Sequence, residues 1–178
     1  MIRGAYFTYT RGAVVLPPHL LELKEACAAR ASDLADWEPR RPPARHVMQV
    51  LTPWLTDAGY TGGAPTPDQQ WHLPGLGDAE LSISFSAWAP ALRTALHIMG
   101  RSAWERREFL HQTLAAALHP QLDYLALAVL NWHESARIDH FSAVCNYLKV
   151  LYSDPATFRL PLGGLLVLGY GPMKPEGD

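Results

Sequence analysis

The chain has 178 residues, of which 48% are hydrophobic and 18% charged, and its formal net charge is −2. This length fits one domain, and the composition is typical of a globular protein rather than a disordered one. A weakly acidic chain does not create a positive field that would attract nucleic acids or anionic membranes. We therefore expect neither as a partner. No apolar run approaches the roughly 18 residues that a membrane-spanning helix needs.

The N-terminal residues contain no continuous apolar segment followed by a cleavage site, so we expect no signal peptide and a cytoplasmic protein. Cys27 and Cys145 lie in apolar surroundings. In a cytoplasmic protein this favours buried, reduced thiols over a disulfide. The sequence predicts no cofactor.

The first third of the chain predicts one strand and two helices. Aromatic and β-branched residues alternate over residues 5–10, which favours a strand. Apolar residues recur at helical spacing over residues 19–37, and three following prolines end this helix. A second helix is expected over residues 44–51; Pro53 interrupts it, and its resumption as far as Asp57 stays open.

The next segment begins with a loop and continues with strands. Glycines and prolines over residues 59–67 predict the longest loop of the chain. Residues 69–73 are expected to form a short edge strand. Apolar and polar residues alternate over residues 80–88, which indicates a half-exposed strand, and residues 92–99 offer the next one.

The middle of the chain predicts a helix that leads into a central strand. Ser102 and Glu105 form a capping box at the helix start, and Pro120 ends the helix after His119. One helix face carries apolar residues at helical spacing, namely Leu110, Leu114, Ala117 and Leu118. The nearly unbroken apolar run over residues 122–130 indicates a strand buried on both faces.

The last third predicts a polar loop over residues 131–140, strands over residues 144–152 and 164–170, and a frayed tail over residues 171–178. A short helix around Phe141, between the loop and the first of these strands, stays open. Together these elements predict a single α+β domain over residues 1–178. We expect a mostly antiparallel sheet of about five or six strands with helices packed on one face.

No motif in the chain identifies a reaction. His133, Glu134 and His140 form the tightest cluster of metal-binding residue types, but they lack the His-Glu-x-x-His spacing that puts two imidazoles on one helix face. No Gly-x-Ser-x-Gly turn and no phosphate-binding loop occur. We predict no metal site and no catalytic residues, while an enzyme with an unrecognised polar or metal site near His133, Glu134 and His140 stays open.

The order of the predicted elements resembles immunity proteins of bacterial polymorphic-toxin systems, most nearly the immunity protein 52 family. The features that carry the resemblance are an N-terminal aromatic strand, Leu-Ala-Asp-Trp at 34–37, Leu-Ser-Ile-Ser-Phe at 81–85, a helix ending at His119-Pro120 before a buried strand, and Asn-Tyr-Leu-Lys-Val-Leu-Tyr at 146–152 before Leu-Pro-Leu-Gly-Gly-Leu-Leu-Val-Leu at 160–168.

The resemblance implies a cytoplasmic protein that binds a cognate toxin, typically a secreted nuclease delivered by a contact-dependent or type VI secretion route, and occludes its active site. It implies no catalytic residues. Acidic side chains would meet the basic cleft of a nuclease, and aromatic side chains beside loops would anchor the contact. The candidate partner-binding residues are Trp71, Asp78, Glu80, Trp132, Glu134 and Asp139.

We expect alanine at Glu134 or Asp139 to weaken toxin binding without changing the melting temperature. The second hypothesis is the small enzyme described above, and the third is a structural subunit of a phage or secretion assembly. The sequence predicts no particular oligomeric state.

Overall fold

A computed structural model of the chain describes residues 1–9, 15–36, 43–62, 71–72, 80–81, 85–100, 103, 107–153 and 159–175. In this part of the chain six strands form one sheet in the order β1-β8-β7-β6-β5-β2. These strands are β1 (Arg3–Phe7), β2 (Thr61–Gly62), β5 (Ala87–Ala89), β6 (Thr94–Ile98), β7 (Tyr124–Leu130) and β8 (Gly164–Tyr170). The predicted α+β class and the number of strands are confirmed.

The sheet is mixed: three of the five pairings between its described strands are antiparallel, as expected for most of the sheet, and two are parallel. Strands β6, β7 and β8 are parallel neighbours at its centre, while β1, β5 and β2 pair antiparallel toward its edges. Parallel neighbours need long crossover connections. Helix α4 (Glu108–Leu118) lies in the connection from β6 to β7, and α5 (His140–Leu151) in the one from β7 to β8.

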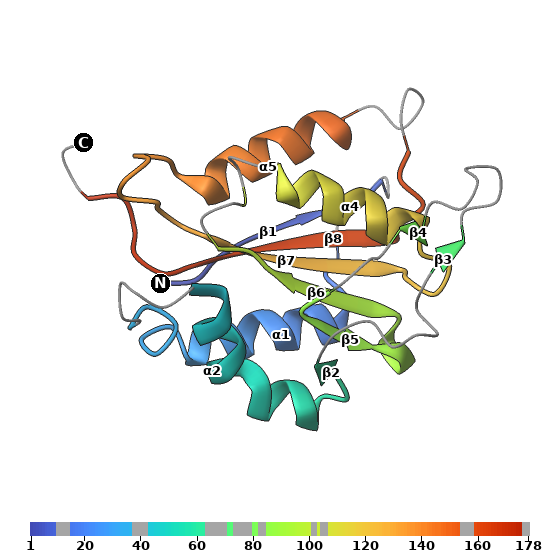
Figure 1. Cartoon of the computed structure of the whole chain (residues 1–178), viewed down its shortest axis with the longest axis horizontal. Helices are drawn as coiled ribbons and strands as arrows, with labels where there is room; N and C mark the ends of the chain where they lie inside the picture. Colours follow the sequence, from blue (N-terminus) through green and yellow to red (C-terminus); the bar gives the residue numbers. More distant parts are fainter. Residues whose placement is uncertain are drawn as a thin grey trace.

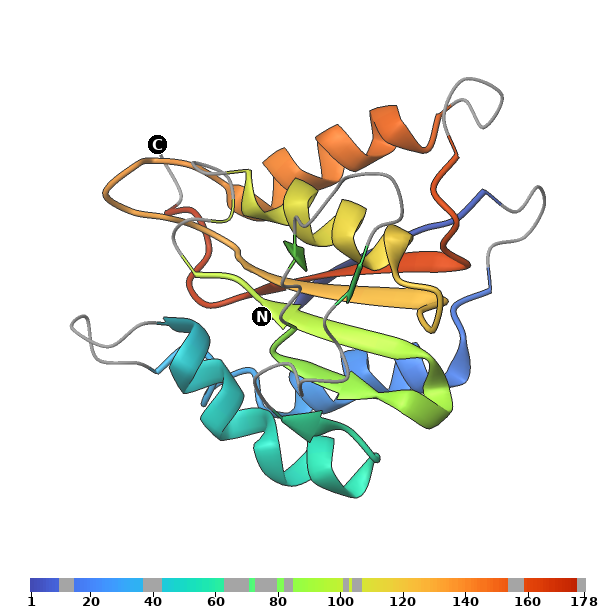
Figure 2. The same cartoon turned by 45° about the vertical axis from the view of Figure 1, so that its right-hand side comes forward.

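Helices cover both faces of the sheet, not one face as predicted. Helices α4 and α5 lie on one face, and α1 (Pro18–Ala29) and α2 (Pro43–Asp57) lie on the other (Figures 1 and 2). Alternate residues of the central strands therefore enter two separate cores. One core contains Ala95, Leu125, Leu127, Leu165 and Val167. The other contains Leu96, Ala126, Ala128, Leu166 and Leu168.

Helices α1 and α2 follow the predicted order. Pro18 stands at the first position of α1, where its missing N–H group costs no helical hydrogen bond. Helix α2 continues through Pro53 to Asp57, so the option that it resumes beyond the proline is the one the structure has. Leu51 before Pro53 and Leu55 after it are both buried, four positions apart on one face of the helix. Tertiary packing on both sides of the proline thus outweighs its local cost.

Helix α4 ends where predicted but packs through a different face. Its buried residues are Phe109, Thr113, Ala116 and Ala117, whereas Leu114 is 39% exposed and Leu118 is 52% exposed. The sequence has two overlapping apolar stripes on this helix. The stripe that contains Phe109 is the one that packs against the core. Its described start is Glu108, preceded by Arg107, and the predicted capping residues Ser102 and Glu105 lie outside the described residues.

Helix α5 occupies the segment that was predicted as a strand at residues 144–152. Its β-branched and aromatic residues suggested a strand. Asp139 caps the helix by accepting a hydrogen bond from the backbone N–H of Ser142 at 2.7 Å. Phe141, Val144, Cys145 and Leu148 are then buried at helical spacing. The short helix considered near Phe141 is the start of this longer one.

The predicted strand at residues 80–88 is divided between two sheets. Strand β4 (Glu80–Leu81) pairs with β3 (Trp71–His72) in a separate two-stranded ladder. Strand β5 belongs to the main sheet, and residues 82–84 between them lie outside the described residues. No helix in the described part of the chain is long and apolar enough to cross a membrane.

Candidate functional site

A turn formed by residues 132–139, called the 132–139 turn below, follows the carboxyl end of β7 and leads into α5. It emerges at the edge of the sheet where β8 also ends (Figure 1). The backbones of His133 and Ile138 pair with each other, with N···O distances of 2.9 and 3.3 Å. Between them, the N–H of Arg137 donates to the carbonyl of Glu134 at 3.2 Å, and Arg137 has a φ of 52°. The turn is therefore closed by its own backbone hydrogen bonds.

Asn131 anchors the base of the 132–139 turn to Met1 and to Gly171, the residue after β8. Its side chain is 1% exposed in relative area, and its Nδ2 donates to the carbonyls of Met1 at 3.2 Å and Gly171 at 3.1 Å. Its backbone N–H donates to the carbonyl of Tyr170 at 2.7 Å. Because buried amides with several partners hold a fixed orientation, the turn leaves the sheet in a defined direction.

Asp139 has a structural role at the other end of the turn. Nη1 of Arg3 lies 3.0 and 2.8 Å from its two carboxylate oxygens, and the hydroxyl of Ser142 donates to it at 2.8 Å. Burial acts to raise the pKa of Asp139. The hydrogen bonds from Ser142 and Arg3, and the charge of Arg3, outweigh it and hold the pKa below its ordinary value of 3.8. The carboxylate therefore joins β1 to the start of α5.

Trp132 is also part of the packed structure. It is 8% exposed, and the ammonium of Lys174 lies 5.7 Å from its ring centroid. It therefore does not project as the aromatic anchor that the sequence suggested. Glu134 does lie on the surface, beside the exposed Ser135 and Arg137. Of the three candidates in the 132–139 turn, Glu134 alone has an exposed side chain.

The other three candidates do not join this turn. Trp71 and Glu80 belong to the ladder of β3 and β4, where Trp71 is opposite Leu81 and Glu80 is opposite His72. In Figure 1 this ladder and the 132–139 turn lie on opposite sides of the view. Asp78 lies outside the described residues. The six candidates therefore do not gather on one described surface.

The residues of the enzyme alternative are brought together only in part. The rings of His133 and His140 are buried, with centroids 5.3 Å apart, and the hydroxyl of Ser135 lies 3.0 Å from Nε2 of His133. Glu134 points to solvent instead. Across the described residues, no group of three or more His, Cys, Asp or Glu side chains is arranged to hold a metal ion. An enzyme at this turn stays a prediction.

A cavity that the sequence did not predict lies on the face covered by α1 and α2. Its volume is about 370 Å³, and it is lined by Pro18, His19, Glu22, Trp54, Ala58, Tyr60 and Leu92. Pro18, His19 and Glu22 belong to helix α1, and Leu92 belongs to the short 3-10 helix Pro90–Leu92. Trp54 lies in α2, and Ala58 and Tyr60 follow the end of that helix. We call this space the α1–α2 pocket.

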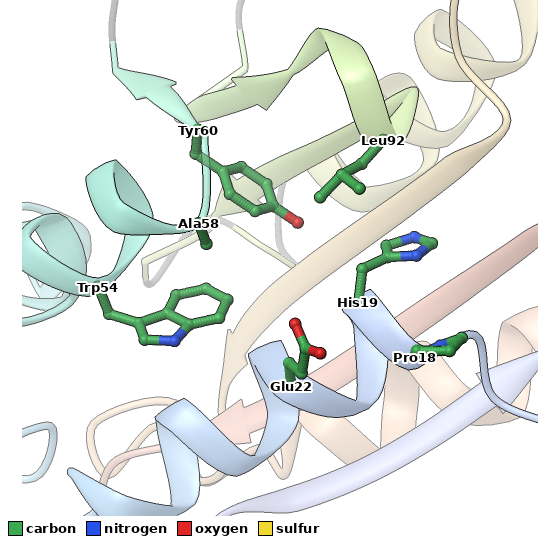
Figure 3. A pocket seen from close by; sticks show the side chains of 7 residues that line it. All are labelled: Pro18, His19, Glu22, Trp54, Ala58, Tyr60 and Leu92. Carbon is green, nitrogen blue, oxygen red and sulfur yellow. The ribbon is translucent and has the colours of Figure 1, made fainter.

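Four side chains of the α1–α2 pocket carry its polar and aromatic character. The carboxylate of Glu22 and the hydroxyl of Tyr60 point into the same space, with the Trp54 and His19 rings on opposite sides of it (Figure 3). The Trp54 and Tyr60 rings have centroids 6.1 Å apart. Nε2 of His19 lies 3.0 Å from the hydroxyl of Thr94. The residues that line the pocket come from three separate segments of the chain without a shared motif.

Two groups of the α1–α2 pocket are shifted in pKa. Burial lowers the pKa of His19, and the nearby Glu22 only partly offsets this, so the neutral imidazole is favoured. Burial, and then the proximity of Cys27 and Glu22, raises the pKa of Tyr60, which keeps its hydroxyl protonated.

Comparison with known proteins gives no relative for this chain. No family model matches it. No curated protein matches it. No solved structure matches it either.

Proposed function

We propose that this protein is a cytoplasmic immunity protein, which binds a cognate bacterial toxin and occludes the active site of that toxin. The proposal starts from the resemblance in element order described above. It implies an inhibitor that acts by one-to-one contact, so the chain itself needs no catalytic group. A secreted nuclease is the class of toxin that the resemblance favours.

The 132–139 turn is the observation that supports this proposal best. Its two ends are fixed by Asn131 and by the Asp139–Arg3 ion pair, and its middle is closed by backbone hydrogen bonds. A segment that is already ordered loses little conformational entropy when a partner binds. The turn therefore presents Glu134 to a partner without a prior folding step.

Charge determines which partner the turn fits. Glu134 supplies an exposed carboxylate, whereas the carboxylate of Asp139 is already paired with Arg3. An exposed carboxylate complements the basic groups with which a nuclease binds phosphates, and it also raises the rate of association. We assign to Glu134 the contact with a basic side chain in the cleft of the toxin.

A protection assay tests the proposed function. The product of the gene beside this one is expressed in a bacterial host with the wild-type protein, with Glu134→Lys or with Glu25→Lys. Glu25 is an exposed glutamate on α1, on the opposite face of the sheet. We expect wild type and Glu25→Lys to restore growth, and Glu134→Lys to fail because it places like charges together.

Two results would count against the proposal. One is a neighbouring gene product that does not slow growth, as expected if the chain is an enzyme or a structural subunit. The other is equal protection by Glu134→Lys and wild type, which would remove the 132–139 turn from the interface. Circular dichroism and melting curves of both variants show whether they are folded.

A further inference from the structure

We propose that the α1–α2 pocket binds a primary ammonium group carried on a small apolar molecule. A volume of about 370 Å³ is within the range of roughly 300–1,000 Å³ that is usual for ligand sites. The pocket is built from residues near the start of β6, whereas the 132–139 turn follows the end of β7, which is parallel to β6. The two sites therefore lie at opposite ends of the parallel strands, and this inference is independent of the proposed function.

The charge of the pocket favours a cation. Its seven lining residues include the acidic Glu22 and no lysine or arginine. The described residues provide no ion-pair partner for Glu22. An anionic ligand would be repelled by this carboxylate. It would also find no N–H donor at Pro18, the residue at the first position of α1.

Two hydrogen-bond acceptors in the pocket can receive N–H donors of a primary ammonium. The carboxylate of Glu22 is the first. The hydroxyl of Tyr60 is the second, since this residue is only 4% exposed and its oxygen has no hydrogen-bond partner within the described structure. A buried polar oxygen without a partner is costly, and a ligand that hydrogen-bonds to it removes that cost.

His19 lies on the other side of the pocket and carries no charge. The hydroxyl of Thr94 donates to the carbonyl of Leu92 at 2.8 Å, so it accepts from Nε2–H of His19 at 3.0 Å. This hydrogen-bond network assigns the proton to Nε2 and leaves the lone pair on Nδ1. A neutral imidazole in this position does not repel a cation.

The remaining surfaces of the pocket suit the apolar part of the ligand. Trp54 and Tyr60 present aromatic rings, and a cation near such a ring face is attracted by its quadrupole. Pro18, Ala58 and Leu92 supply aliphatic surface. The pocket therefore combines one anionic group with an apolar wall, as recognition of an alkylamine requires.

Titration of the full-length protein with a matched series of small molecules tests this inference. The series contains n-butylammonium, the neutral n-butanol, the anion n-butyrate, and tetramethylammonium, a cation without N–H donors. Binding is followed by calorimetry and by the NMR signal of the Trp54 indole N–H, assigned with Trp54→Phe. We expect saturable binding of butylammonium, weaker binding of tetramethylammonium, and no saturable binding of butanol or butyrate.

Matched variants place the binding in the pocket. Glu22→Gln should weaken butylammonium binding by about tenfold or more, as expected when a hydrogen bond to a charged group is lost. Glu25→Gln changes an exposed glutamate of the same helix outside the pocket and should have no effect. Tyr60→Phe should weaken binding without lowering the melting temperature, because the removed hydroxyl has no partner within the described structure.

The inference is overturned if butanol binds as tightly as butylammonium, if Glu22→Gln and Glu25→Gln behave alike, or if no amine gives a saturable signal. Nα-acetyl-lysine methylamide, which carries the same ammonium on a peptide unit, identifies the source of the group. If it binds as well as butylammonium, the pocket accepts a lysine side chain. If it is excluded, the ligand is a free amine.

Discussion

The guanidinium of Arg3 donates two hydrogen bonds to the carboxylate of Asp139, a residue 136 positions further along the chain. The same guanidinium donates to the hydroxyl of Ser142 at 2.7 Å and lies 4.2 Å from the ring centroid of Phe141. These contacts join strand β1 to the first turn of α5. They thereby fix the position of the C-terminal end of the 132–139 turn.

Asp139→Ala should therefore destabilise the protein. It removes both a helix cap and a partly buried ion pair, and we expect a loss of about 1–2 kcal/mol in the free energy of unfolding. This differs from the expectation from sequence, in which alanine at Asp139 left the melting temperature unchanged. Glu134→Ala, at an exposed position of the same turn, should change stability by less than about 0.5 kcal/mol. Urea unfolding of both variants measures the difference, and equal stabilities would contradict the structural role of Asp139.

Gly169→Ala should also be destabilising, because a side chain on β8 would enter the base of the turn. A Cβ atom there would meet the side-chain oxygen of Asn131 and would lie 2.8 Å from a ring carbon of Phe141. We expect a cost of about 1–3 kcal/mol, typical of overpacking. Gly100→Ala is the control, since the nearest atom to its Cβ is 3.9 Å away. Thermal melts that show no difference between these variants would disprove the predicted clash.

Stability should fall when the pH is lowered through the range in which His119 titrates. Burial, and then the charge of Arg93, lowers the pKa of His119 below 6.5, so the unfolded chain takes up this proton at a higher pH than the folded chain. The stability that His119 contributes by staying neutral in the fold is therefore complete above pH 6.5. It is lost as the pH falls toward the pKa of His119 in the folded protein. In the fold, the ring lies 5.7 Å from that of Trp88, and Nδ1 accepts from the N–H of Gln121 at 3.3 Å.

His119→Gln should reduce the loss of melting temperature between about pH 7.5 and about pH 5. Glutamine does not titrate, and its carbonyl can replace Nδ1 as an acceptor. His111→Gln is the control, because His111 is exposed on the same helix. A pH dependence that is the same in His119→Gln and the wild type would refute the assignment.

The packing of α4 gives a prediction that separates its two apolar stripes. Phe109 is 1% exposed, and Phe109→Ala should cost about 3–5 kcal/mol because it leaves a cavity in the core. Leu118 is 52% exposed, and Leu118→Glu should cost less than about 0.5 kcal/mol. Chemical denaturation curves decide between the stripes. A larger loss for Leu118→Glu would restore the orientation predicted from sequence.

Sequence patterns predicted the strands that are buried on both faces and the helix end that is set by a proline. The apolar run of β7, the stop at Pro120 and the last strand β8 are examples. The error at α5 arose because Val144, Tyr147 and Val150 favour strands locally, while the Asp139 cap and the buried face of the helix decide the outcome. Without α5 as a crossover, the parallel pairing of β7 with β8 was not predictable.

The sites were less predictable than the fold. The loop after β7 was located from its polar sequence, but the partner of Asp139 is Arg3, and no local pattern connects residues so far apart. The α1–α2 pocket depends on the packing of three segments around Glu22 and Tyr60. Its residues are individually ordinary, so only the fold reveals that they meet.

The dissociation constant between this protein and the product of the neighbouring gene tests the proposed function most directly. Calorimetry is carried out with the wild type, with Glu134→Ala and with Glu25→Ala as a matched surface control. We predict one-to-one binding by the wild type and by Glu25→Ala, and affinity weaker by about tenfold or more for Glu134→Ala. The absence of saturable binding, or equal affinities for Glu134→Ala and the wild type, would contradict an immunity function that acts through the 132–139 turn.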